Sequence, residues 1–189
     1  MNKTQKLTYT AMLTALCVAA NFLTVPVAPN KYLSFAIVLC FFAGARLGWI
    51  SGIVVGFAGD LIAHLIRPMG AYNWFIGLSC ALFGLVAAIT FRLKTNLLAQ
   101  TAIATVVAFV VCSCALNTFG LWLNYIVGVS PDVVGLFRFF AMDKGGIKKS
   151  FWLYLAGRLP LQALNAAVNG LLAYLLLRSK VIAKAFHAE

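Results

Sequence analysis

Residues 150–178 constrain this chain most, because the stretch is long and apolar and yet carries a polar stripe. At 1.5 Å per residue a helix of this length crosses a bilayer. The polar side chains recur at helical spacing, which places them on one face of that helix: Arg158, Gln162, Asn165 and Asn169. An arginine in a membrane span is costly and usually faces the protein interior or a water-filled cavity. The stripe therefore predicts the wall of a small-molecule site.

The rest of the chain has the same apolar character. Of 189 residues, 63% are hydrophobic and only 10% are charged, which is too few charges for the surface of a soluble domain. We expect a single integral membrane domain over residues 1–189, all-α, with six transmembrane helices. The predicted helices span approximately residues 7–25, 32–45, 49–66, 75–91, 97–127 and 150–178.

The charge pattern favours membrane anchoring over a nucleic-acid partner. Net charge is +11, but no cluster of basic residues lies in a soluble segment. The side shared by the termini carries Lys3, Lys6, Arg46, Arg92, Lys94, Arg178, Lys180 and Lys184. The other side carries Lys31, Arg67, Arg138, Lys144, Lys148 and Lys149, of which four lie in one long loop that constrains orientation less. This bias places both termini in the cytoplasm.

The polar residues of different helices converge in the outer half of the predicted bundle. Arg158 lies about 12 Å below the start of its helix, and Asn117 lies at similar depth. Lys31, Arg67 and Tyr72 belong to the same half, whereas the inner half is nearly all apolar. This arrangement predicts an outward-facing cup, because a self-sufficient carrier or channel needs a polar path on both sides of its site.

The residue types in the cup indicate an anionic ligand with a planar head. Lys31, Arg67 and Arg158 favour a carboxylate or phosphate. Asn and Gln amides suit a heteroaromatic edge, and Tyr72, Trp74 and Trp122 offer rings for stacking or, alternatively, interface anchors.

Two further patterns leave alternatives open. Asp60, His64 and Arg67 share a helical face, where an internal ion pair or hydrogen-bonded cap is favoured over a ligand or cation contact. Ala11, Ala15 and Ala19 form a small-residue ridge that serves either internal packing or docking of another subunit. Gly52, Gly56 and Gly59 form a second close-packing edge.

The chain shows no motif for catalysis or energy coupling. It has no GxxxxGK[ST] loop, since GGIKKS at residues 145–150 does not fit, and no H-E-x-x-H, G-x-S-x-G or Cys/His cluster. We therefore predict no enzyme, no metal and no cofactor. A stand-alone secondary carrier or small channel remains an alternative, and a membrane enzyme such as a lipid transferase lacks a nucleophile.

Several segments resemble the substrate-binding S components of energy-coupling factor (ECF) vitamin transporters, and most closely the folate type. They are the Ala11-x-x-x-Ala15 strip, GARLGWISGIVVGFAGDLIAHLIRPMGAYNWFIG (residues 44–77), LNTFGLWLNY (residues 116–125) and GRLPLQALN (residues 157–165). The polar loop at residues 128–149 is the main departure from the family pattern.

This resemblance implies a cell-membrane protein that binds a vitamin from the extracellular side. It implies partnership with a membrane scaffold subunit and two cytoplasmic ATPases, docking of the scaffold on Ala11 and Ala15, and toppling of the protein in the bilayer. The implied ligand-binding residues are Lys31, Gly70, Tyr72, Trp74, Asn117, Trp122, Arg158 and Gln162. Folate is the first choice of ligand, and pantothenate, a thiamine precursor, a queuosine precursor or another small vitamin stays open.

Overall fold

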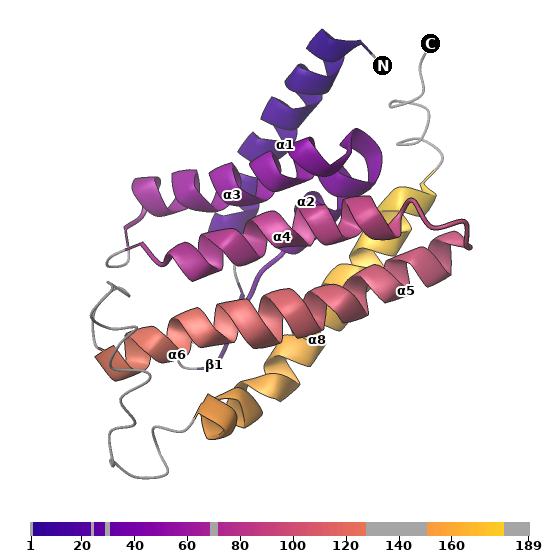
Figure 1. Cartoon of the computed structure of the whole chain (residues 1–189). Helices are drawn as coiled ribbons and strands as arrows, with labels where there is room; N and C mark the ends of the chain where they lie inside the picture. The colour runs from indigo at the N-terminus through magenta and orange to yellow at the C-terminus, as the bar shows by residue number, and fades with distance from the viewer. Residues whose placement is uncertain (1, 24, 29–30, 69–71, 128–150, 180–189) are drawn as a thin grey trace.

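The structure is a computed structural model that describes residues 2–23, 25–28, 31–68, 72–127 and 151–179. Its helices in chain order are α1 (Lys3–Phe22), α2 (Ala36–Leu47), α3 (Trp49–Ile66), α4 (Trp74–Thr90), α5 (Leu97–Ala108), the π-helix η1 (Phe109–Asn117), α6 (Thr118–Val127) and α8 (Phe151–Arg178) (Figure 1). Gly70 and the polar loop at residues 128–149 lie outside the described residues.

These segments form six helical rods, because α5, η1 and α6 follow one another without a break. The prediction of an all-α membrane fold with six helices is confirmed, and the bounds of α3 match those expected. Three rods, Trp49–Ile66, Leu97–Leu123 and Tyr154–Arg178, are long and apolar enough to cross a membrane. Only 28% of each of these spans is buried inside the protein, as expected where apolar side chains face lipid.

The connection between α1 and α2 differs from the predicted loop at residues 25–31. Strands β1 (Val25–Ala28) and β2 (Lys31–Leu33) pair in antiparallel fashion, with Val25 opposite Leu33 and Pro26 opposite Tyr32. The second helix consequently starts at Ala36 rather than near Tyr32. Pro26 cannot continue a helix, and pairing lets two short extended segments satisfy their backbone groups.

The rods form two groups that meet along α2 and α4. Helices α1 to α4 pack on one another, while α8 packs on α5, η1 and α6. Within the first group, glycines bring α2, α3 and α4 into backbone contact. A Cβ on Gly52 would lie 2.8 Å from the Gly84 carbonyl oxygen and 2.9 Å from Gly44 Cα. This confirms the predicted packing edge, which Gly59 extends to Cys17 of α1.

The fifth rod, residues 97–127, is longer at 1.5 Å per residue than a bilayer is thick. It contains the π-helical stretch η1, in which the Thr118 hydroxyl donates to the Ser113 carbonyl oxygen at 2.8 Å. A π-helix turns less per residue than an α-helix and frequently occurs at functional sites. Here it directs Ser113 and Asn117 toward the space between the two groups of rods.

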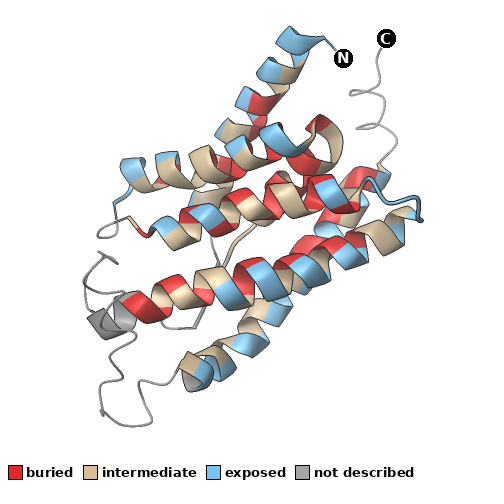
Figure 2. Ribbon diagram, viewed as in Figure 1, coloured by how far each residue is buried: buried red, intermediate tan, exposed pale blue. Residues whose placement is uncertain are grey.

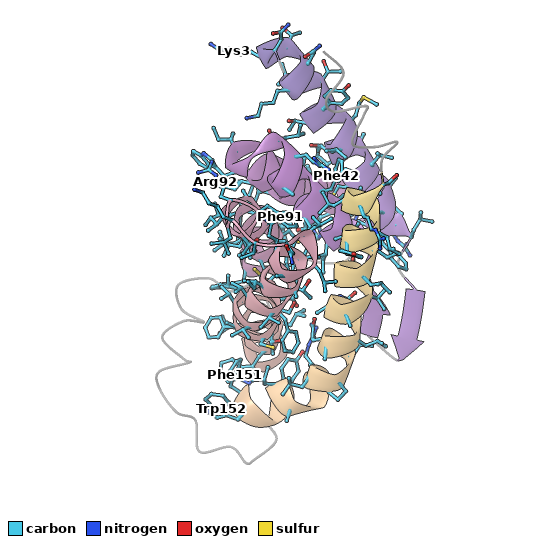
Figure 3. All side chains as sticks on the ribbon, turned by 90° about the vertical axis from the view of Figure 1, so that its right-hand side faces the viewer. Lys3, Phe42, Phe91, Arg92, Phe151 and Trp152 are labelled. Carbon is cyan, nitrogen blue, oxygen red and sulfur yellow. The ribbon has the colours of Figure 1, made fainter. Side chains whose placement is uncertain are left out.

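The two ends of the bundle carry different residues. Lys3 and Arg92 lie toward one end, whereas Phe151 and Trp152 lie at the other (Figure 3). At the basic end Arg46 donates to the Leu177 carbonyl oxygen at 3.1 Å and ties α2 to α8. The first turns of α1 project past the other helices and are largely exposed (Figure 2).

Candidate functional site: a cavity between the two groups of helices

A cavity of about 630 Å³ lies between the two groups of helices. Helices α1, α3 and α4 form one wall, η1, α6 and α8 form the other, and α2 lies between them. Its volume falls within the range of sites for vitamin-sized ligands, on the order of 300–1,000 Å³. It is therefore the candidate binding site.

Helix α8 presents the first three residues of its polar stripe to this cavity. Arg158, Gln162 and Asn165 all line it. Arg158 Nη1 donates to the Tyr154 hydroxyl at 3.3 Å, and the guanidinium lies 5.7 Å from the centre of that ring. Arg158 Nε is buried and has no hydrogen-bond partner among the described residues. The arginine is thus held over Tyr154 with a donor left for a ligand.

Asn169, the last polar residue of the stripe, has a structural role. This residue is fully buried, and its amide donates to the Ser34 carbonyl oxygen and to Asn165 Oδ1, each at 2.8 Å. Asn165 combines this hydrogen bond with a place in the cavity wall.

Asn117 and Trp122 were predicted as ligand contacts from the fifth rod. Asn117 lines the cavity, and its buried Oδ1 has no partner within the described part of the chain. Trp122 is not among the lining residues. Its ring is 6% exposed and lies 6.1 Å from Phe119 and 5.5 Å from Phe151, in a cluster that joins α6 to α8. A ligand contact by Trp122 stays a prediction.

Helix α3 and the turn after it supply the most polar part of the opposite wall. The Tyr72 hydroxyl donates to Asp60 Oδ2 at 2.9 Å, and the His64 ring meets the Tyr72 ring edge-on at 5.1 Å. Burial, and then the neighbouring Asp60 carboxylate, raise the pKa of Tyr72, so its hydroxyl stays a donor. Asp60 is thus hydrogen-bonded, as one of its two interpretations predicted, and it also lines the cavity.

Trp74 lies beside this group without lining the cavity. It is 60% exposed, stacks on Phe57 at 6.5 Å and meets Tyr72 edge-on at 5.2 Å. This placement agrees with an interface anchor, and ligand stacking by Trp74 stays a prediction.

Asn73 is a cavity residue that sequence reasoning missed. Its Oδ1 accepts from the Phe75 backbone N–H at 3.0 Å and caps α4. Its buried Nδ2 lines the cavity with no partner in the described ranges. The available signal was an asparagine directly before an apolar run and after a Pro–Gly turn, which predicts a helix cap but not a site.

Four of the eight predicted ligand residues thus line the cavity: Tyr72, Asn117, Arg158 and Gln162. For Lys31 the structure gives only the backbone, in β2 opposite Ala28. Three cysteines also line the cavity, Cys17, Cys40 and Cys80.

The lining charges favour an anion. Two arginines, Arg67 and Arg158, against one carboxylate, Asp60, give a formal charge of +1 when histidine is not counted. Three buried groups along the walls, Arg158 Nε, Asn73 Nδ2 and Asn117 Oδ1, offer two donors and one acceptor. Such groups cost free energy when buried and unpaired, so they indicate a ligand with matching acceptors and donors.

A family model described as "ECF transporter, substrate-specific component" matches residues 5–177. The chain belongs to this family. As a substrate-specific component it is a membrane transporter subunit and not an enzyme.

Two solved structures are similar to this substrate-specific component. The crystal structure of FolT bound with folic acid matches with a TM-score of 0.67 at 17% identity, covering 93% of each chain. The S component of a bacterial ECF transporter matches with a TM-score of 0.64 at 23% identity, covering 94% of this chain and 95% of that one. At these identities the likeness shows the fold. A search of curated proteins found no significant match.

Proposed function

We propose that this substrate-specific component binds folate or a related small anionic vitamin from the extracellular side. The observation that carries the proposal is the cavity wall in which Arg158 keeps a donor unpaired opposite other unpaired amides. A ligand carboxylate would meet the guanidinium, and a heteroaromatic head would meet the amides. The likeness to FolT, whose structure holds folic acid, makes folate the first ligand to test.

The proposed transport cycle needs partners. The chain has no nucleotide-binding motif, so hydrolysis would come from two cytoplasmic ATPases joined through a membrane scaffold subunit. Ala11 and Ala15 are exposed on α1, where small residues allow another helix to approach closely. We place the scaffold there and propose that the protein topples on it to deliver its ligand inward.

The proposed orientation has both termini in the cytoplasm. The described basic residues at the ends of the rods support it: Lys3, Lys6, Arg46, Arg92, Lys94 and Arg178 belong to the end where the first helix begins and the last one ends. The cavity residues Arg67, Tyr72 and Tyr154 belong to the other end. The cavity would then face outward.

The test is a binding assay on the purified protein, combined with identification of any co-purifying small molecule by mass spectrometry. We expect tight binding of folic acid. Tight binding of another vitamin, such as pantothenate or a thiamine or queuosine precursor, would keep the subunit role and replace folate. No binding to any member of the vitamin panel would contradict the proposal.

A stand-alone carrier is the remaining candidate function, and liposomes distinguish it. Uptake by this chain alone, without ATP or partner subunits, would favour that candidate. We expect uptake only when the scaffold and the ATPases are present.

A further inference from the structure

Asp60 is the only acidic residue in the described part of the chain, and it lies in the wall of the cavity. A carboxylate within a membrane span is expensive, and such residues are retained where they meet a partner or a pathway. The hydrogen bond from Tyr72 occupies Asp60 Oδ2. An ionised carboxylate offers about four acceptor positions, so most of its capacity is not used by this bond.

The surroundings of Asp60 hold it in place for a ligand. Tyr72 comes from the turn before α4, and its ring lies over Gly77, where a Cβ would come within 3.0 Å of Tyr72 Cζ. The His64 and Trp74 rings contact Tyr72 on other sides. Tyr72 is therefore fixed by packing and holds one oxygen of Asp60.

The carboxylate and the arginine belong to different walls of the cavity. Asp60 is on α3, which packs on α1, α2 and α4, whereas Arg158 is on α8, which packs on α5, η1, α6 and α2. Both residues nevertheless line the same cavity. A ligand that fills it meets an acceptor-only group on one wall and a donor-only group on the other.

We propose that Asp60 is a specificity-determining residue that accepts hydrogen bonds from an N–H edge of the ligand's planar head, with Tyr72 as its positioning residue. The proposal rests on the proposed function and adds to it which edge of the ligand is recognised. A carboxylate pairs strongly with two adjacent N–H groups, as in an amino group beside a ring N–H, and poorly with a carbonyl edge. The cavity would thus select a ligand whose planar head carries two adjacent N–H donors and whose anionic group lies at a distance from them, near Arg158.

A purely structural role is the rival explanation, in which Asp60 and Tyr72 only tie the turn to α3. The two explanations predict different effects of a substitution on ligand preference. A structural residue affects all ligands alike, whereas a specificity residue affects a ligand with the complete donor edge more than one that lacks part of it.

The experiment compares two probes on three proteins by calorimetric titration. The probes are folic acid and its 2-desamino analogue, which lacks the amino group of the planar head. The proteins are the full chain, Asp60→Asn and Tyr72→Phe. Asparagine keeps the size of Asp60 and an acceptor for Tyr72 but removes the charge, and phenylalanine keeps the ring contacts of Tyr72.

We expect the unchanged chain to prefer folic acid by about tenfold or more, the scale of a charge-assisted hydrogen bond. Asp60→Asn should weaken binding of folic acid more than binding of the analogue, because the analogue keeps the ring N–H but lacks the amino group, and the preference should fall well below that of the unchanged chain. Tyr72→Phe should reduce the preference to an intermediate value. Thermal unfolding without ligand shows that each variant is folded.

Three results would overturn the proposal in distinguishable ways. Equal weakening of both probes by Asp60→Asn assigns the residue a structural role. An unchanged preference removes Asp60 from recognition, although folate binding by the protein stands. Binding of neither probe by the unchanged chain contradicts the folate function itself and this inference with it.

Discussion

At the scale of single residues, Arg158 is paired with Tyr154 in the same manner as Arg178 is paired with Tyr174 on the same helix. In each case Nη1 donates to the hydroxyl four residues earlier, at 3.3 Å and 3.4 Å respectively. The guanidinium groups lie 5.7 Å and 5.9 Å from the two ring centres. Only Arg158 lines the cavity, so a comparison of the two arginines separates the effect of the local contact with tyrosine from the effect of a position in the cavity wall.

We predict that Arg158→Ala weakens binding of an anionic vitamin by about 1.5–3 kcal/mol, the contribution of a hydrogen bond to a charged group. Arg178→Ala is the matched control and should leave affinity unchanged. Calorimetric titration of both variants checks the prediction. Equal affinities for the two variants would remove Arg158 from the site.

A second residue-scale prediction concerns Gly77, which makes room for the Tyr72 ring. An added methyl group would collide with the Tyr72 hydroxyl and approach Phe57 Cε2 to 3.4 Å. Gly77→Ala should therefore displace Tyr72 from Asp60 and weaken folic acid binding by about 1 kcal/mol, the net value of one hydrogen bond. The control is Leu78→Ala, at a position on α4 where the residue is 47% exposed. If titration shows both variants to bind like the unchanged chain, Tyr72 does not position the site.

At the scale of elements, close approach of α2, α3 and α4 builds the rigid wall that carries Asp60. We predict that Gly84→Ala destabilises the protein by about 1–3 kcal/mol, because its Cβ would lie 2.6 Å from Gly52 Cα and backbone atoms cannot move aside. Thermal unfolding in detergent should show a lower Tm.

The control for this change is Gly157→Ala on α8. A Cβ there meets nothing within 4 Å, and alanine is the better helix former. We expect an unchanged or slightly raised Tm. A Tm for Gly84→Ala that equals the control's would show that the helix crossing tolerates a methyl group.

The helices themselves followed from hydrophobic length and punctuation. Pro26 ends the first apolar run, and Arg67 to Asn73 separates two others, so the number of rods and the bounds of α3 were predictable. The strand pair and η1 were not. Residues 25–33 are too short to show a strand period, and the choice of a π-helix over an α-helix in η1 depends on hydrogen bonds such as that between Thr118 and Ser113.

At the scale of the whole molecule, α1 has an exposed face of small residues and an opposite face that packs on the bundle. Ala11, Ala15 and Ala19 are exposed, whereas Thr10, Leu13 and Cys17 are buried against the bundle. The internal-packing interpretation of the alanine ridge therefore does not hold in this structure. An outward ridge of small residues remains for lipid or for another helix.

We predict that Ala15→Trp prevents co-purification with the scaffold and ATPase subunits while vitamin affinity stays unchanged. A tryptophan would fill the shallow ridge and keep a partner helix at a distance. Val106→Trp, at a 61% exposed position on α5, is the control for added bulk on a lipid-facing helix. Normal assembly of the Ala15→Trp variant would show that docking occurs elsewhere.

The sequence by itself determined the membrane class, the six helices and the polar stripe of α8, because these depend on local length, hydropathy and period. It also indicated Asn117, Arg158 and Gln162, which line the cavity, since polar groups within apolar spans are conspicuous, and it indicated Tyr72 in the turn after α3. Only the tertiary structure decided which groups share the cavity.

The surroundings of Trp122 and Asp60 were likewise decided by tertiary packing. Whether a ring faces the cavity or a neighbouring helix depends on how α6 packs on α8, which helical spacing does not specify. The carboxylate looked like part of an internal ion pair because His64 and Arg67 follow it on its own helix. Its hydrogen-bond donor instead comes from the next turn, where Gly77 leaves space for the Tyr72 ring.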